Sequence, residues 1–172
     1  INREVERIAS EAGDVIFLPY LTGTNSPEFD PRATGVFYGL RLRHTRAHLA
    51  RAVMEGVAFL LRKNLDVLER ICGRMRSVIS LGGGARSEIW NRMKADITER
   101  TVTVPESVES TSLGAAVLAA VELGMYPSIE HAVQTAVRVG RVYEPAQGGR
   151  YRKAYERFLE LYERLNPLFQ AG

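Results

Sequence analysis

Three consecutive glycines, Gly82, Gly83 and Gly84, are the residues of this sequence best suited to chemistry. They follow the apolar run VISL (78–81) and lead directly into a predicted helix. Because glycine has no Cβ, a ligand can approach the backbone closely at such a loop. The first N–H groups of the helix that follows are free, and they carry a partial positive charge. The pattern indicates either a nucleotide-binding loop or simply a tight turn between strand and helix.

Two nucleotide-binding motifs can be compared with this loop. A Walker loop needs Gly-Lys-Ser/Thr after its glycines to hold phosphates and magnesium, whereas here the glycines are followed by Ala-Arg-Ser, which excludes it. The dinucleotide fingerprint is closer, since Gly82-x-Gly84-x-x-Ser87 differs from it only at the third glycine or alanine. Glu106, just past the next predicted strand, stands near the place of a ribose-binding acid. From the loop alone, a dinucleotide-binding oxidoreductase domain and a plain turn both remain open.

Other common catalytic motifs do not occur in the sequence. The three histidines are scattered and no His-Glu-x-x-His zinc motif is present. There is also no Gly-x-Ser-x-Gly elbow, and no acidic residue stands out as a general base. We therefore predict no catalytic residue and no metal ligand within these 172 residues.

The elements around the glycines predict an α/β fold. Residues 77–81 form a buried strand, and Ser87 is placed to cap a helix whose apolar face is Ile89, Met93 and Ile97. The alternating, β-branched TVTV (101–104) is a second strand. A strand–helix–strand order favours a parallel pair with the helix on one face of the sheet.

The remaining elements surround this unit. A long helix is predicted from the N-cap Thr45 to a stop at Gly73, and residues 15–23 form an extended apolar run. Residues 35–40 are either a short strand or a compact turn. Further helices are predicted over 2–12, 112–123, 128–137 and 148–165. The last of them places Tyr151, Tyr155, Phe158, Tyr162 and Leu165 on one stripe.

Composition narrows the possible partners. The chain of 172 residues is long enough for one domain with one core. Its 23 basic and 20 acidic residues are interleaved, which argues against a nucleic-acid partner. No apolar run has the roughly 18 residues needed to span a membrane. Cys72 is the single cysteine and cannot form an internal disulfide, so we expect a buried thiol and a cytoplasmic location.

Motifs outside the loop point to one family. The segment GVFYGLRLRHTRAHLARAVME (35–55) resembles a signature of the FGGY carbohydrate kinases, and LPYLTGTNSPEFDPRATG (18–35) resembles the loop that leads into it. GGGARSEIWNRMKADI (82–97) is similar to the family's adenosine loop, and ESTSLGAAVLAAVELG (109–124) to its Leu-Gly-Ala-Ala helix. The closing tyrosine-rich helix matches as well. The resemblance runs in order over nearly the whole chain and is nearest to the xylulokinase branch.

This resemblance implies a fold and an activity. The family has an RNase-H-like fold of the actin and hexokinase type, here expected to be partial, with a small sheet flanked by helices. Residues 1–172 would form a single domain, the later part of the second, ATP-binding domain. ATP, magnesium and a sugar, most simply xylulose, would be bound by the complete enzyme. Its sugar-binding domain, phosphate loops and catalytic aspartate are expected upstream, so the chain alone should be inactive. An actin-like half domain that acts as an interaction module is the alternative.

The resemblance also implies cofactor-binding residues. Gly83, Gly84 and Ala85 would lie against the adenine and ribose of ATP, and Gly84→Val should therefore raise the Michaelis constant for ATP. Glu88 stands where related kinases hold the base with a polar side chain, and its carboxylate can accept a hydrogen bond from the exocyclic amine of adenine. Asn91, one turn further along, is a second candidate, with a solvent-facing helix residue as the alternative.

Three other residues of the matched motifs are expected to be structural. Trp90 should pack in the core rather than wall the base, and His48 and Glu55 share one face of the long helix without an evident chemical role. We also expect one edge of the small sheet to lack its usual neighbours and the stripe of the long helix to be partly uncovered. Such surfaces favour association, so the isolated chain should self-associate or need a partner.

Overall fold

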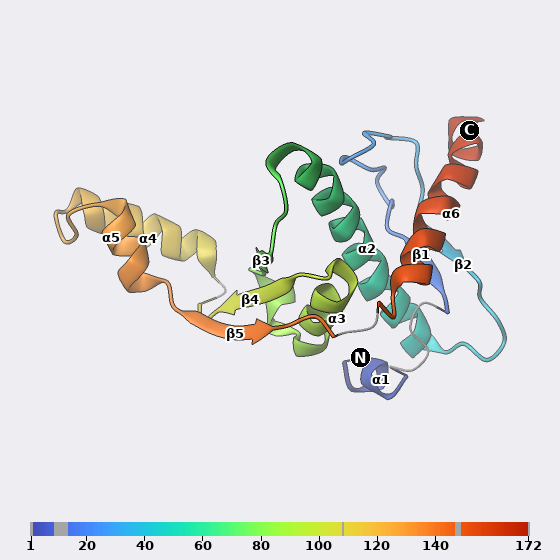
Figure 1. Cartoon of the computed structure of the whole chain (residues 1–172), viewed down its shortest axis with the longest axis horizontal. Coiled ribbons are helices and arrows are strands. Elements are labelled where there is room, and N and C mark those ends of the chain that lie inside the picture. The colour runs from blue at the N-terminus through green and yellow to red at the C-terminus, as the bar shows by residue number, and fades with distance from the viewer. Residues whose placement is uncertain (1, 9–13, 108, 147–148, 172) are drawn as a thin grey trace.

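The computed structural model describes residues 2–8, 14–107, 109–146 and 149–171. Its elements alternate between helix and strand for most of the chain (Figure 1). In order they are α1 (Asn2–Arg7), β1 (Ile16–Leu18), β2 (Val36–Tyr38), α2 (Arg46–Cys72), β3 (Ser77–Ile79), the 3₁₀ helix η2 (Gly83–Arg86), α3 (Glu88–Thr98), β4 (Thr101–Pro105), α4 (Ser110–Glu122), α5 (Ile129–Ala136), β5 (Val139–Tyr143) and α6 (Arg152–Ala171). Most predicted elements are thereby confirmed. The first predicted helix, 2–12, ends at Arg7, and its positions 9–12 lie outside the described residues.

The main sheet has the order β3-β4-β5. Strands β3 and β4 are parallel, as the strand–helix–strand order predicts, and α3 crosses between them. Strand β5 adds to the other edge of β4 in antiparallel orientation, with an irregular register between Val104 and Pro105. The sequence analysis did not predict β5. A separate pair, β1 and β2, is antiparallel, which selects the strand for residues 35–40 over the turn.

Helix α2 forms the centre of the molecule. Residues of the local sequence specify both its ends and its packing face. Thr45 is the N-cap residue, and Gly73 ends the helix with a φ of 80°, a conformation that favours glycine. Gly56 lies so close to β1 that a Cβ there would overlap the carbonyl oxygen of Phe17. The missing side chain thus allows the close contact of helix and strand.

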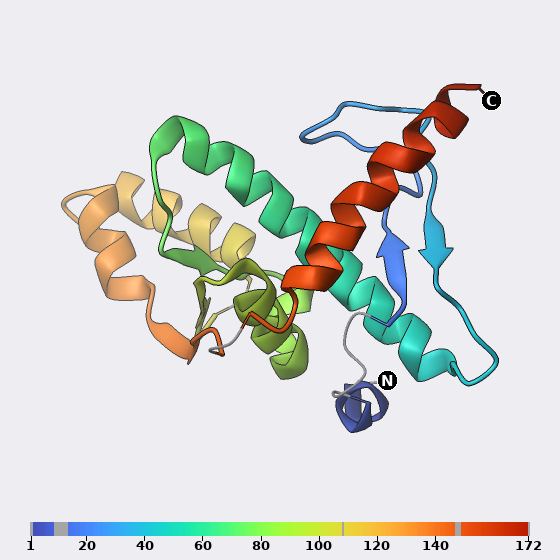
Figure 2. The same ribbon diagram turned by 45° about the vertical axis from the view of Figure 1, so that its right-hand side comes forward.

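The larger core lies where α6 crosses α2 (Figure 2). Phe158 is fully buried and its ring lies 5.5 Å from that of Phe59 on α2. The predicted aromatic stripe is confirmed, since all four of its aromatic residues are buried. The predicted bounds 148–165 are wrong, because the helix begins at Arg152 and continues through Pro167 to Ala171. A short second core joins α3 to the sheet.

Helices α4 and α5 pack on each other at the end of the molecule away from α6 (Figure 1). Among the described residues of α4, Val117 is the one that is buried. A groove of about 430 Å³ runs between these helices and the sheet, and its walls are largely apolar. They include Ile79, Leu113, Leu118, Ile129 and Val133. The uncovered stripe expected on α2 is also present, with Val53, Val57 and Leu68 exposed.

We expect the isolated 172-residue chain to self-associate at micromolar concentration, because monomers rarely leave an apolar groove of this size open. Sedimentation velocity checks this expectation. Leu118→Lys together with Val133→Lys should shift the chain toward the monomer, because both side chains line the groove. Leu168→Lys, at an exposed apolar site on α6 outside the groove, is the control. A stable monomer that binds no hydrophobic dye would contradict the expectation.

Two expectations from the sequence concern the burial of Cys72 and the absence of a membrane-spanning helix. Cys72 is exposed at the last residue of α2, and its Sγ donates to the carbonyl oxygen of Leu68 at 3.1 Å. The prediction of a buried thiol is therefore wrong, because the apolar stripe of α2 turns away from the core at the end of the helix. Within the described ranges, no helix combines the length and the apolar character needed to cross a membrane.

Candidate functional site

The glycine loop joins the end of β3 to the start of α3, beside the carboxyl ends of two parallel strands. The amide of Ala85 donates to the carbonyl of Gly82 at 3.1 Å, and the amide of Ser87 to that of Gly84 at 3.3 Å, which folds the loop into the single turn of η2. These bonds do not engage the amides of Gly83 and Gly84. Ser87 caps α3 as predicted, since its side chain accepts from the amide of Trp90 at 3.4 Å. The loop thus offers free donors at a helix start.

The three glycines differ in what a side chain at each position would meet. Gly82 has a φ of 73°, which disfavours any residue with a Cβ. A Cβ on Gly84 would lie 2.8 Å from Cζ3 of the Trp90 ring. A Cβ on Gly83 would meet no atom within 4 Å. The space around a Cβ on Gly82 is open as well, but the positive φ already favours glycine there. Gly83 is therefore the position where neither the backbone nor the packing accounts for the absent side chain, which leaves space for a ligand.

Trp90 packs beneath the loop, as predicted. Its indole Nε1 donates to the carbonyl oxygen of Met54 on α2 at 3.0 Å. The ammonium of Lys94 lies 4.4 Å from the centre of the indole ring and 3.0 Å from Oγ of Ser80. Burial lowers the pKa of Lys94. The long helix with the family signature thus supports the glycine loop through Trp90.

Asn91 holds the loop from below. Its Nδ2 donates to the carbonyl oxygen of Ala85 at 2.7 Å, and its Oδ1 accepts from Oγ of Ser80 at 3.0 Å. The side chain is fully buried, so the alternative of a solvent-facing helix residue is wrong. The amide of Asn91 thereby ties the end of β3 to the turn of η2, and its two hydrogen bonds fix the path of the glycines.

A surface cavity of about 550 Å³ opens beside the loop, and we call it the loop cavity. It is lined by Ala85, Arg86, Val104, Pro105, Glu106, Gly140 and Arg141. Arg86 forms an ion pair with Glu109 at the start of α4. Arg141 comes from β5, and its Nη1 lies 3.8 Å from Oε2 of Glu88 on the first turn of α3. The loop, the residue after β4 and strand β5 therefore each contribute a charged side chain to one cavity, namely Arg86, Glu106 and Arg141.

The sequence-predicted residues lie together, although not all in the same way. Gly83, Gly84 and Ala85 form the loop, and Glu88 extends from the adjoining helix with 60% of its side chain exposed. Asn91 lies under the loop, where its amide bonds the backbone. Sequence reasoning missed Arg141, and the irregular strand VGRVY carried no signal that could have placed it here.

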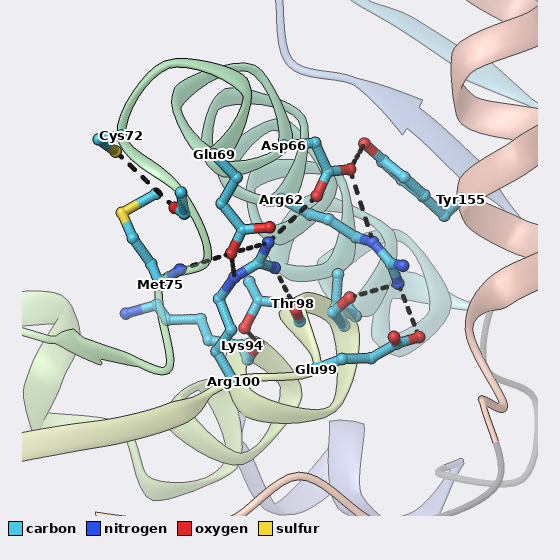
Figure 3. A network of polar contacts seen from close by, with 12 residues as sticks. Arg62, Asp66, Glu69, Cys72, Met75, Lys94, Thr98, Glu99, Arg100 and Tyr155 are labelled. Atoms are coloured by element: carbon cyan, nitrogen blue, oxygen red, sulfur yellow. Dashed lines mark hydrogen bonds and ion pairs between the residues drawn. The ribbon is translucent and has the colours of Figure 1, made fainter.

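The opposite end of α3 is anchored by a polar cluster, defined as Arg62, Asp66, Glu69, Arg100 and Tyr155 (Figure 3). The guanidinium of Arg100 lies 2.9 Å from Glu69 and 3.3 Å from Asp66, and Arg62 donates to the carbonyl oxygen of Ile97 at 2.8 Å. Tyr155 donates to Asp66 at 2.8 Å, which joins α6 to α2. Carboxylates and guanidinium groups pair with one another here, so the cluster fixes the position of α3.

The two other polar residues of the signature helix have structural roles. Nδ1 of His48 accepts from the amide of Thr45 at 3.0 Å, which caps α2. Glu55 is buried and its Oε1 lies 2.6 Å from Nε of Arg51. Arg51 in turn donates to the hydroxyl of Tyr151 at 2.8 Å. The expectation that these residues lack a chemical role is consistent with this geometry. Across the described residues, no group of three or more His, Cys, Asp or Glu side chains could hold a metal ion.

Comparisons with known proteins show the family of the chain. The model of the C-terminal domain of the FGGY family of carbohydrate kinases matches residues 3–123. The xylulose kinase of Staphylococcus epidermidis is 36% identical over 152 residues, which cover 88% of this chain and 30% of that protein. The gluconokinase of Bacillus licheniformis is 33% identical over 167 residues, which cover 96% of this chain and 32% of that protein.

Solved structures give the same result. The crystal structure of ligand-bound xylulose kinase from Lactobacillus acidophilus superposes with a TM-score of 0.84 at 26% identity, over 98% of this chain and 35% of that one. The chain thus spans about a third of the length of the curated relatives it matches. Its α/β fold is part of the RNase-H-like, actin and hexokinase type of ATPase domain. The chain belongs to the FGGY family of carbohydrate kinases.

Proposed function

We propose that residues 1–172 form a single domain that supplies the adenosine-binding side of an ATP-dependent sugar kinase. The observation that carries this proposal is the glycine loop at the carboxyl end of β3, where the position of Gly83 is open and the adjoining Ala85 and Arg86 line a cavity of about 550 Å³. Gly83, Gly84 and Ala85 would lie against the adenine and ribose, and Glu88 would contact the base. Asn91 would act on the nucleotide through the loop backbone that it holds.

The reaction of such a kinase is the attack of a sugar hydroxyl on the γ-phosphate of ATP. Catalysis of phosphoryl transfer relies mainly on positioning and on stabilisation of charge. The loop would position the nucleoside end, while the aspartate base and the phosphate loops would come from the rest of the kinase. Magnesium would be bound with the phosphates there, because the described residues of this chain lack a carboxylate cluster for it.

We propose xylulose as the sugar, since proteins named xylulose kinase recur among the relatives. Gluconokinases and a glycerol kinase are also among the relatives, so the identity of the sugar is tested directly. With the complete kinase and ATP, kcat/KM should be highest for xylulose, followed by gluconate and glycerol, as measured by ADP release. Release of ADP with none of the three would contradict the proposal. The proposed function also includes a cytoplasmic location for the kinase.

The 172-residue chain alone is expected to phosphorylate nothing and to bind adenine nucleotides weakly. Competition between ADP and NAD for a fluorescent ATP analogue separates the possible functions. Displacement by ADP alone supports the kinase, displacement by NAD supports a dinucleotide-binding domain, and no binding supports an interaction module. Measurable phosphorylation of xylulose by the chain alone would contradict the division of roles proposed here.

A further inference from the structure

The ion pair between Glu88 and Arg141 lies next to the glycine loop. Glu88 belongs to the first helical turn after the loop, and Arg141 lines the loop cavity from β5. The two residues are more than 50 positions apart and meet because β5 pairs with β4. Gly140 permits this approach, since a Cβ there would lie 2.9 Å from the amide nitrogen of Glu106.

The pair is loose enough to serve a ligand. The distance of 3.8 Å between Nη1 and Oε2 exceeds that of an N–H···O hydrogen bond. A carboxylate accepts through two oxygens and a guanidinium has five N–H donors, so both groups keep bonding capacity. Interaction with the Tyr143 hydroxyl and with Glu88 raises the pKa of Arg141, which keeps this group charged.

The chemistry of adenine fits such a pair. Its Watson–Crick edge places an amine donor, N6, next to an acceptor, N1, whereas guanine and hypoxanthine place the acceptor O6 next to the donor N1–H. A carboxylate beside N6 and a guanidinium beside N1 satisfy adenine, and the same pair faces the wrong groups of the other two bases. Glu88 alone supplies only the acceptor, since a carboxylate cannot donate to N1.

We propose that Arg141 is a specificity-determining residue of this kinase, and that it donates to N1 of adenine while Glu88 accepts from N6. The proposal rests on the proposed function, since it deepens the assignment of the same site. Arg86 is the other guanidinium on the cavity, but its ion-pair partner is Glu109, the N-cap residue of α4.

The test is steady-state kinetics of the complete kinase with altered bases. Arg141→Ala should raise the Michaelis constant for ATP about tenfold or more, the effect of one hydrogen bond to a charged group. This effect should vanish with 1-deaza-ATP, which lacks N1, and should persist with purine riboside triphosphate, which lacks the amine. The effect of Glu88→Ala should persist with 1-deaza-ATP and vanish with purine riboside triphosphate. Glu88→Gln should reduce the preference for ATP over ITP, because an amide can serve either edge.

Arg92→Ala is the matched control. Arg92 also pairs with Glu88, at 3.5 Å, but it does not line the loop cavity and lies on a neighbouring cavity that Glu88 also lines. Its loss should leave the Michaelis constant for ATP nearly unchanged.

The possible failures can be told apart. A wild-type kinase that does not use ATP would remove the proposed function itself. A wild-type enzyme that uses ATP, with variants whose effects are equal for ATP and both analogues, would show that the pair only supports the fold. Absence of any effect of Arg141→Ala on ATP kinetics would equally overturn the inference.

Discussion

Gly83→Val in the complete kinase is expected to raise the Michaelis constant for ATP roughly tenfold or more, since a side chain forced into an occupied space costs about 1–3 kcal/mol. The added side chain would meet no protein atom near its Cβ, so thermal stability should change little. Sugar affinity without nucleotide should also be unchanged. Initial-rate kinetics measure the Michaelis constant for ATP, and isothermal titration measures the affinity for the sugar.

Gly84→Val is expected to behave differently. A Cβ at this position would lie 2.8 Å from the Trp90 ring, which is held by Met54 and Lys94. The substitution should therefore lower the free energy of unfolding by about 1–3 kcal/mol, and any change in ATP kinetics would be secondary. Gly83→Val, not Gly84→Val, is thus the informative test of the loop.

Gly114→Ala is the matched control for both variants. Gly114 also has open space around a Cβ, but it lies on α4 and lines the apolar groove. This substitution should leave ATP kinetics unchanged. Unaltered ATP kinetics in a stable Gly83→Val enzyme would remove the loop from the nucleotide site.

Glu55→Ala should be the most destabilising substitution, with a loss of about 3–5 kcal/mol, because the charge of the buried Arg51 would lose its counter-ion. The two side chains are 2% and 5% exposed and their ion pair joins successive turns of α2. Arg51 also donates to Tyr151 and to the carbonyl oxygen of Val5, so the pair connects α1, α2 and α6. The melting temperature of the kinase should fall by about 10 °C.

Two comparisons isolate the effect of burial. Glu160 and Arg164 have the same four-residue spacing on α6 but are exposed, so Glu160→Ala should change stability by less than about 1 kcal/mol. The double variant Arg51→Met, Glu55→Leu should recover most of the loss, because no buried charge is then left unpaired. Equal effects of Glu55→Ala and Glu160→Ala on stability would show that burial does not increase the contribution of the ion pair.

The sequence by itself determined the local structure around the glycines. A strand, a glycine loop, the cap Ser87 and the apolar face of α3 are all encoded within about 25 consecutive positions, and each follows from backbone preference or side-chain period. The burial predicted for that strand is wrong, since Ile79 of β3 is exposed and lines the apolar groove at the edge of the sheet. The ends of α2 at Thr45 and Gly73 were predictable for the same reason. Gly82, Gly83 and Gly84 could be grouped as a ligand loop, because the absence of three side chains is visible without any fold.

Only the tertiary structure decided which groups surround that loop. Asn91 falls at a helix position that sequence leaves open, and its burial depends on Ser80 and Ala85 folding back over it. Strand β5 forms because the edge of β4 offers unpaired backbone groups to a segment with little pattern of its own. That pairing carries Arg141 to Glu88. Helix periods and caps act over a few residues, whereas pairing across a sheet edge joins distant segments, so the cavity beside the loop could not be read from the chain alone.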